Sequence, residues 1–175
     1  MVTASHNPPQ DNGYKVYWSN GAQIIPPHDR GISEAIDSIQ TITDLVMPDL
    51  STQEGALRPI PAEVWRDYLA RVLDLRVHHE TGARAVYTAM HGVGWETLSA
   101  ILDRAGYPAP VVVSEQIEPD GSFPTVSFPN PEEPGAMDLS FAAADEARAE
   151  FVIANDPDAD RLAVALPDPD GGWRR

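Results

Sequence analysis

The sequence lacks the features that mark several common classes of protein. It has no cysteine, which excludes disulfide bonds, thiolate metal sites and cysteine nucleophiles. It has no apolar run near the ~18 residues that a membrane-spanning helix needs. Its N-terminus also lacks the charged and then apolar layout of a secretion signal. We therefore expect a cytoplasmic protein with no membrane partner.

Basic residues are scarce as well. Only 12 lysines and arginines stand against 27 acidic residues, which gives a formal net charge of −15. Such a field repels the phosphates of nucleic acids, so we expect no nucleic-acid partner. An anionic substrate would have to be held by a few placed basic groups or by a bound cation.

Apolar residues make up 42% of the chain, which is ordinary for a folded protein. The N-terminal part predicts a β-hairpin over residues 14–25, in which Lys15 faces away from the apolar side that carries Tyr14. A helix is expected over residues 28–42. A proline-rich stretch follows and is typical of a linker, so we divide the chain into residues 1–45, a linker 46–61, and residues 62–175.

Helices and strands alternate in the second part of the chain. Helices are predicted over 62–77, 94–105 and 138–148, and strands over 84–90, 111–114 and 151–154. This order predicts an α/β fold with a parallel sheet covered by helices. Functional loops of such sheets gather at the carboxyl ends of the strands. Two loops meet that description: "MHGVG" after Met90 and "NDPDADR" after Ala154.

The second loop has three carboxylates at alternate positions, Asp156, Asp158 and Asp160. In an extended segment alternate side chains project the same way, and a hard cation such as Mg²⁺ relieves the repulsion among them. An EF-hand is excluded because the positions that need glycine and glutamate hold Arg161 and Pro167. A solvated acidic turn and the loop of an aspartyl-phosphate phosphatase remain as alternatives.

Ser5, in "TASHNP", has three possible roles: turn residue, hydrolase nucleophile and phosphate carrier. A hydrolase nucleophile would need a Gly-x-Ser-x-Gly elbow, but the flanking positions hold Thr3 and Asn7. His6 is the next residue, and neighbouring side chains in an extended loop point apart, so we expect it to be poorly placed as a direct base for Ser5.

Four motifs occur in order: "TASHNP", "TAMHGVG", "FPNPEEP" and "NDPDADR". Together they resemble the α-D-phosphohexomutase superfamily of phosphoglucomutases and phosphomannomutases, most of all its phosphopentomutase-type branch. The resemblance implies that residues 1–45 are the end of domain I and residues 62–175 are domain II of a four-domain protein. It therefore implies an incomplete chain, which by itself would be inactive.

The resemblance also implies the roles of the site residues. Ser5 would be the phosphoserine, and Mg²⁺ would be bound by Asp156, Asp158, Asp160 and a phosphate oxygen on Ser5. His6, Lys15 and Arg161 match positions that the family keeps beside these groups and are candidates for proton transfer or phosphate binding.

Other matched positions have weaker implications. His91 is expected to shape its loop, while Asn130 and Glu132 match a family signature to which spacing assigns no role. The alternatives for Lys15 and Arg161 are a solvated strand lysine and an ion pair with a neighbouring aspartate.

The implied reaction moves phosphate between C1 and C6, or C5, of an aldose phosphate through a sugar bisphosphate intermediate. The motifs do not discriminate among glucose, mannose and pentose phosphates. The alternatives are a non-catalytic Mg²⁺-binding α/β module and the phosphatase named above.

Overall fold

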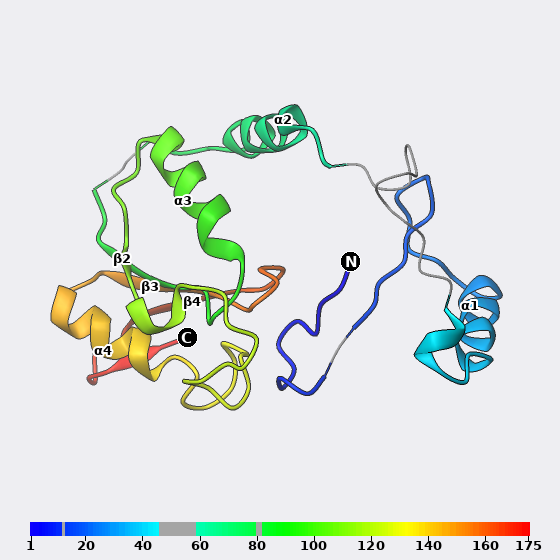
Figure 1. Cartoon of the computed structure of the whole chain (residues 1–175). Helices are drawn as coiled ribbons and strands as arrows, with labels where there is room; N and C mark the ends of the chain where they lie inside the picture. Colours follow the sequence, from blue (N-terminus) through cyan, green and yellow to red (C-terminus); the bar gives the residue numbers. More distant parts are fainter. Residues whose placement is uncertain (12, 46–58, 80–81) are drawn as a thin grey trace. The chain divides into compact units, whose positions relative to one another are not determined.

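The computed structural model describes residues 1–11, 13–45, 59–79 and 82–175 (Figure 1). They divide into two compact units. The first comprises Met1 and Tyr14–Val64, and the second comprises Val2–Gly13 and Trp65–Arg175. Asn12 and residues 46–58 of the predicted linker lie outside the described residues. Nowhere in the described ranges does a helix have the length and apolar character needed to span a bilayer.

The second unit contains a mixed five-stranded sheet. Its strands are β1 (Ala85–Thr88), β2 (Val111–Val112), β3 (Phe151–Asn155), β4 (Leu162–Pro167) and β5 (Trp173–Arg174). The spatial order is β2-β1-β3-β4-β5, in which β2, β1 and β3 are parallel neighbours. β4 and β5 are antiparallel additions.

The three parallel strands were predicted from the sequence, and β4 and β5 were not. A loop as short as residues 156–161 cannot cross over to a parallel position, so the chain returns beside β3 in the opposite direction. The predicted parallel sheet is present in β2, β1 and β3, two antiparallel strands extend it at this edge, and the α/β class is confirmed.

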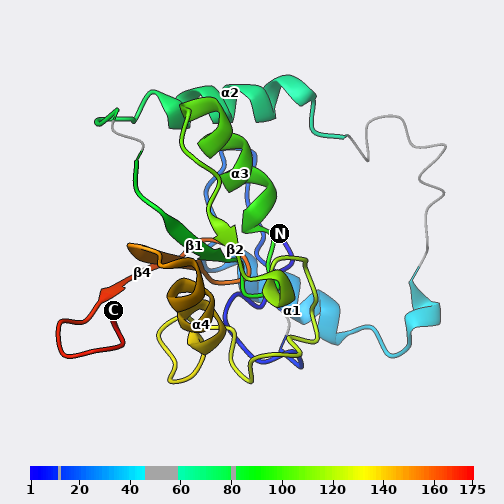
Figure 2. The same ribbon diagram turned by 90° about the vertical axis from the view of Figure 1, so that its left-hand side faces the viewer.

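Helices cover both faces of the sheet because strand side chains alternate between them. Val86 and Val152 belong to the core cluster that includes Ala144 of α4 (Asp138–Ala147). Tyr87, the next residue on β1, points to the other face and stacks on Trp95 at a ring distance of 5.5 Å. Trp95 lies in α3 (Gly94–Ala105), and α3 and α4 lie on opposite sides of the sheet (Figure 2).

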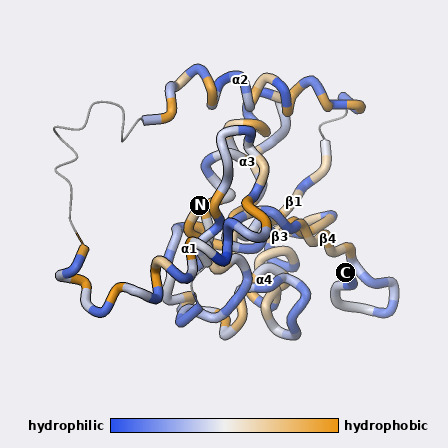
Figure 3. Tube along the Cα trace, turned by 90° about the vertical axis from the view of Figure 1, so that its right-hand side faces the viewer, coloured by the Kyte–Doolittle hydropathy of each residue, from blue (hydrophilic) through white to orange (hydrophobic). Residues whose placement is uncertain are grey.

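The helix α2 (Ala62–Leu73) is shorter than the predicted 62–77. Val64 and Tyr68 of this helix are more than half exposed. Leu69 is fully buried instead. Figure 3 shows hydrophobic and hydrophilic residues alternating along this helix.

The first unit has the predicted hairpin and a short helix. The amide of Trp18 donates to Ala22 O at 2.9 Å, and that of Ile24 donates to Val16 O at 3.0 Å. The helix α1 (His28–Asp37) ends before the predicted residue 42, and a 3₁₀ turn covers Ile42–Asp44. Large apolar side chains are exposed, among them Tyr14, which was predicted to face a core.

Candidate active site

The aspartate loop is held closed between two paired strands. Asn155 of β3 and Leu162 of β4 are opposite each other in the sheet. Across the loop, Nδ2 of Asn155 donates to the carbonyl of Arg161 at 2.6 Å. The hydroxyl of Tyr87 on β1 donates to Oδ1 of Asn155 at 3.1 Å. This pair of hydrogen bonds fixes the side chain of Asn155 and, through it, the end of the loop.

The "MHGVG" loop packs directly against the aspartate loop. Val93 N donates to the carbonyl of Pro157 at 2.9 Å. Gly92 lies so close to Pro157 that a Cβ atom at this position would overlap its backbone. The two loops predicted at the carboxyl edge of the sheet are therefore in contact, and glycine is required where they meet.

His91 has the loop-shaping position that was expected. It is buried, and its Nε2 lies 2.8 Å from Oγ1 of Thr125. Burial lowers the pKa of His91, and the nearby charge of Asp120 opposes this effect. Its amide donates to Gln116 O, and its carbonyl accepts from the amide of Asp120. These contacts engage both its ring and its backbone in holding the loop.

Ser5 lies at a tight turn and not in an extended segment. Its φ of 53° is in the left-handed region. The turn is stabilised by the amide of Ser5, which donates to Oγ1 of Thr3 at 2.9 Å, and by the amide of Asn7, which donates to Ala4 O. Thr3 is itself fixed, because its amide donates to Gly13 O at 3.0 Å.

The hydroxyl of Ser5 reaches the aspartate loop, which lies more than 150 positions away in the sequence. Its Oγ lies 2.9 Å from Oδ2 of Asp156 and 3.0 Å from Oδ1 of Asp158. A hydroxyl has one proton, so it can donate to only one of these carboxylates at a time. The two carboxylates bring two negative charges to one hydroxyl, and a bound cation would neutralise them.

The prediction that His6 points away from Ser5 is wrong. Its Nδ1 lies 3.1 Å from the Oγ of Ser5 and 3.9 Å from Oδ2 of Asp156. The left-handed turn at Ser5 removes the alternation that an extended chain would impose. The imidazole is therefore within reach of the serine proton.

The three aspartates have the geometry of a metal site. Each offers one oxygen, and these oxygens lie within 4.8 Å of one another. Asp156 is fully buried, Asp158 partly buried and Asp160 exposed. Burial raises the pKa of Asp156, while hydrogen bonds from Ser5 and from the amide of Arg161 act in the opposite direction. Carboxylate and hydroxyl oxygens suit a hard divalent ion, so these residues fit one.

Two further predicted site residues, Arg161 and Lys15, form hydrogen bonds through their backbone amides. The backbone amide of Arg161 donates to Oδ1 of Asp156 at 3.0 Å, while its side chain is exposed and forms no ion pair within the described residues. Lys15 belongs to the first unit, where its amide donates to Met1 O at 2.8 Å.

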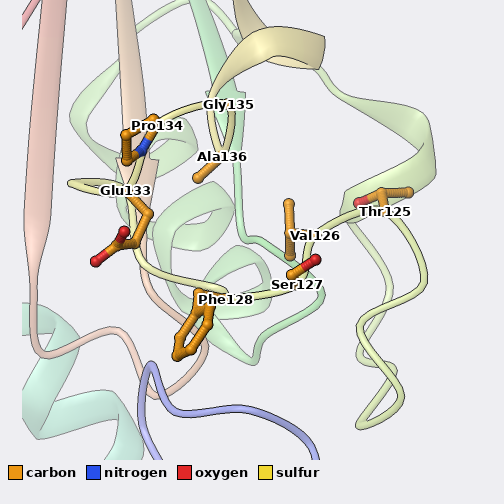
Figure 4. A pocket seen from close by; sticks show the side chains of 8 residues that line it. All are labelled: Thr125, Val126, Ser127, Phe128, Glu133, Pro134, Gly135 and Ala136. Atoms are coloured by element: carbon orange, nitrogen blue, oxygen red, sulfur yellow. The ribbon is translucent and has the colours of Figure 1, made fainter.

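The "FPNPEEP" segment is a packed turn. Oδ1 of Asn130 accepts from the amide of Glu132 at 3.1 Å, and Pro129 and Pro131 are fully buried. Beside this turn, residues 125–128 and 133–136 surround a hollow of about 260 Å³ (Figure 4). Asn130 therefore has a structural role here, and the backbone of Glu132 completes its turn.

Sequence reasoning missed Thr3, Tyr87 and Asn155. Thr3 was within the quoted "TASHNP" motif, and its Oγ1 donates to Oδ2 of Asp158 at 2.9 Å. Tyr87 and Asn155 have no motif of their own. Their positions near the carboxyl ends of adjacent parallel strands were the available signal.

Comparisons with known proteins identify relatives of this chain. Residues 63–171 match the family model "Phosphoglucomutase/phosphomannomutase, alpha/beta/alpha domain II", and residues 1–43 match the model of domain I. A Haemophilus influenzae protein named "Probable phosphomannomutase" is 51% identical over 99% of this chain and 36% of its own length. The human phosphopentomutase is 46% identical over 99% of this chain and 29% of its own.

A solved structure from the same family also resembles this chain. The phosphoglucomutase/phosphomannomutase family protein of Burkholderia thailandensis superposes with a TM-score of 0.70 at 26% identity, covering 98% of this chain and 33% of that one. The chain thus spans about a third of the length of these relatives. The chain belongs to the phosphoglucomutase/phosphomannomutase family.

Proposed function

We propose that the protein is a phosphosugar mutase that uses Ser5 as its phosphate carrier. It moves a phosphoryl group between C1 and C6, or C5, of an aldose phosphate through a sugar bisphosphate. The observation that carries the proposal is the position of the Ser5 Oγ within 3.0 Å of carboxylate oxygens of both Asp156 and Asp158. The relatives named as phosphomannomutase and phosphopentomutase support the reaction class.

The transfer has two balanced halves. In the first, the bond between phosphorus and the Ser5 Oγ breaks, a bond forms from phosphorus to a sugar hydroxyl oxygen, and the proton of that hydroxyl is passed to the Ser5 Oγ. In the second, the bond between phosphorus and the sugar oxygen at the other end of the bisphosphate breaks, phosphorus bonds to the Ser5 Oγ, and the proton of Ser5 returns to that sugar oxygen. Nδ1 of His6 lies 3.1 Å from the Ser5 Oγ, so we assign to His6 the proton transfers at Ser5.

The aspartates and the serine would hold Mg²⁺ together. When bound, the ion neutralises charge on the phosphoryl group as it transfers. The chain itself supplies oxygens of Asp156, Asp158, Asp160 and Ser5, brought together by two loops of one unit. A bound cation would also reduce the repulsion between an anionic substrate and a chain with a net charge of −15.

The remaining site residues receive supporting roles. We assign phosphate binding to the guanidinium of Arg161, which is exposed and forms no ion pair in the described part of the chain. We assign phosphate stabilisation to Lys15. We further infer that residues 1–45 form the end of domain I, residues 46–61 the linker and residues 62–175 domain II.

The test is the chemical state of Ser5. Peptide mapping of the full-length protein isolated from cells should find phosphate on Ser5, and Ser5→Ala should abolish mutase activity. Ser99→Ala is the matched control, because that hydroxyl donates to the carbonyl of Glu96 within its own helix. An unmodified Ser5 together with full activity of Ser5→Ala would overturn the assignment.

A further inference from the structure

The carboxylates of Asp156 and Asp158 have the same arrangement of hydrogen bonds. Asp156 accepts from the amide of Arg161 with Oδ1 and presents Oδ2 to the Ser5 Oγ. Asp158 accepts from the hydroxyl of Thr3 with Oδ2 and presents Oδ1 to the same Ser5 Oγ. In each aspartate one oxygen accepts from a donor other than Ser5, and the second oxygen lies at the Ser5 Oγ.

We propose that Thr3 is a positioning residue that limits Asp158 to one metal-facing oxygen and so makes the site select Mg²⁺ over Ca²⁺. The proposal rests on the proposed function, since it takes Asp158 as a metal ligand. It goes beyond that function because it assigns the choice of ion to a residue outside the ligand set.

The physical reason is the difference in coordination between the two ions. Mg²⁺ takes about six oxygens at about 2.0–2.1 Å and uses carboxylates through single oxygens. Ca²⁺ takes about six to eight oxygens at about 2.3–2.6 Å and often uses both oxygens of one carboxylate. For Asp158 to bind an ion with both oxygens, Oδ2 would have to turn towards the ion and so either weaken or lose its hydrogen bond from the hydroxyl of Thr3. That hydrogen bond therefore penalises the larger ion.

Thr3 is held in the orientation that this role requires. Its hydroxyl accepts from the amide of Ser5 at 2.9 Å and uses its one proton for Asp158. Its amide donates to Gly13 O, and a side chain at Gly13 would overlap the carbonyl of Thr3. One hydroxyl thus connects the backbone of the phosphate carrier to the carboxylate opposite it.

The experiment measures the ratio of Ca²⁺ to Mg²⁺ dissociation constants for the purified protein. Each ion displaces Mn²⁺, and free Mn²⁺ is followed by electron paramagnetic resonance. Thr3→Val and the smaller Thr3→Ala should lower the ratio by about tenfold, which is typical of a lost outer hydrogen bond to a ligand. Thr3→Ser keeps the hydroxyl and should keep the ratio.

A double variant shows whether Thr3 acts through Asp158. In the Asp158→Asn background, Thr3→Val should produce no further change in the ratio, and an additional change of the same size would contradict the proposal. An unchanged ratio in folded Thr3→Val or Thr3→Ala, or a ratio in Thr3→Ser that falls as far as in Thr3→Val, would overturn it.

The same data separate this proposal from the proposed function. Ser5 without phosphate but with a Thr3-dependent ion ratio would remove only the mutase assignment. Ser5 with phosphate and an ion ratio independent of Thr3 would remove only the role of Thr3. A wild-type protein that binds neither ion would remove the role of Thr3 and the metal part of the mechanism together.

Discussion

The hydroxyl of Ser5 donates to the fully buried carboxylate of Asp156 at 2.9 Å, across 151 positions of sequence. Neither loop makes this site by itself. The serine turn brings one oxygen, and the loop after β3 brings the charged oxygens around it. Changes in either loop should therefore affect the ion and the serine together.

Asp158→Asn should weaken Mg²⁺ binding by about tenfold or more, because a neutral amide oxygen replaces a charged ligand. Titration with Mn²⁺ as a competitor measures the effect. Asp170→Asn is the control, since Asp170 is an exposed turn residue before β5. Equal Mg²⁺ affinities of wild type and Asp158→Asn would remove Asp158 from the ligand set.

Asp156 should make the metal-free protein less stable as the pH rises. Burial raises the pKa of Asp156 in the folded state above its ordinary value of 3.8. At pH values between 3.8 and the folded pKa, the folded state therefore keeps a proton that the unfolded state has released. The stability that this proton gives is present below pH 3.8 and is lost as the pH rises through the folded pKa.

Asp156→Asn should consequently raise the free energy of unfolding at pH 7 in EDTA, and this gain should shrink towards pH 3.8. Urea unfolding at several pH values tests it. Added Mg²⁺ should stabilise the wild type more than the variant. A variant that is less stable than wild type at pH 7 in EDTA would contradict the prediction.

Gly92→Ala should destabilise the contact between the two loops. A Cβ at this position overlaps the backbone of Pro157, which has no flexible end that could move aside. Overpacking of this kind costs about 1–3 kcal/mol. Thermal unfolding and Mg²⁺ titration should both show the loss, whereas Gly121→Ala, which meets no neighbour, should change neither.

Tyr87→Phe should lower stability at pH 8 by about 1 kcal/mol, because the hydrogen bond to Asn155 is lost. Burial raises the pKa of Tyr87 from 10.0 to about 12. Between pH 10 and about pH 12, Tyr87 loses its proton in the unfolded state before it does so in the folded state, so the stability of the wild type falls as the pH rises. The difference in stability between the wild type and Tyr87→Phe should therefore shrink over this range. Denaturation at pH 8 and pH 11 measures this, with exposed Tyr68→Phe as the control. A constant deficit would refute the linkage.

The sequence predicted those parts of the fold that depend on local patterns. The helix at 94–105 follows apolar periodicity and the strand beginning at residue 151 is a short apolar run, and the structure has α3 at Gly94–Ala105 and β3 at Phe151–Asn155. β4 was missed although Leu162–Pro167 is a similar apolar run, because its pairing with β3 depends on how the loop between the two strands closes. Helix ends were also overestimated, since residues such as Ile42 continue the periodicity after the backbone has left the helix.

For the site, the sequence identified the charged groups but not what orients them. Asp156, Asp158 and Ser5 were found from residue type and spacing. The orientation of His6 depends on the left-handed φ of Ser5, which no spacing rule gives. Thr3 and Asn155 act through hydrogen bonds to residues distant in sequence or across a loop, so only the folded chain reveals them.

The antiparallel return of β4 sets a limit on how this site can change. Since Asn155 and Leu162 are paired in the sheet, the ends of residues 156–161 are tethered to each other. A single inserted or deleted residue would either break the ladder or rotate an aspartate out of the convergent set. The pairing of the two strands therefore fixes the number of residues in this loop.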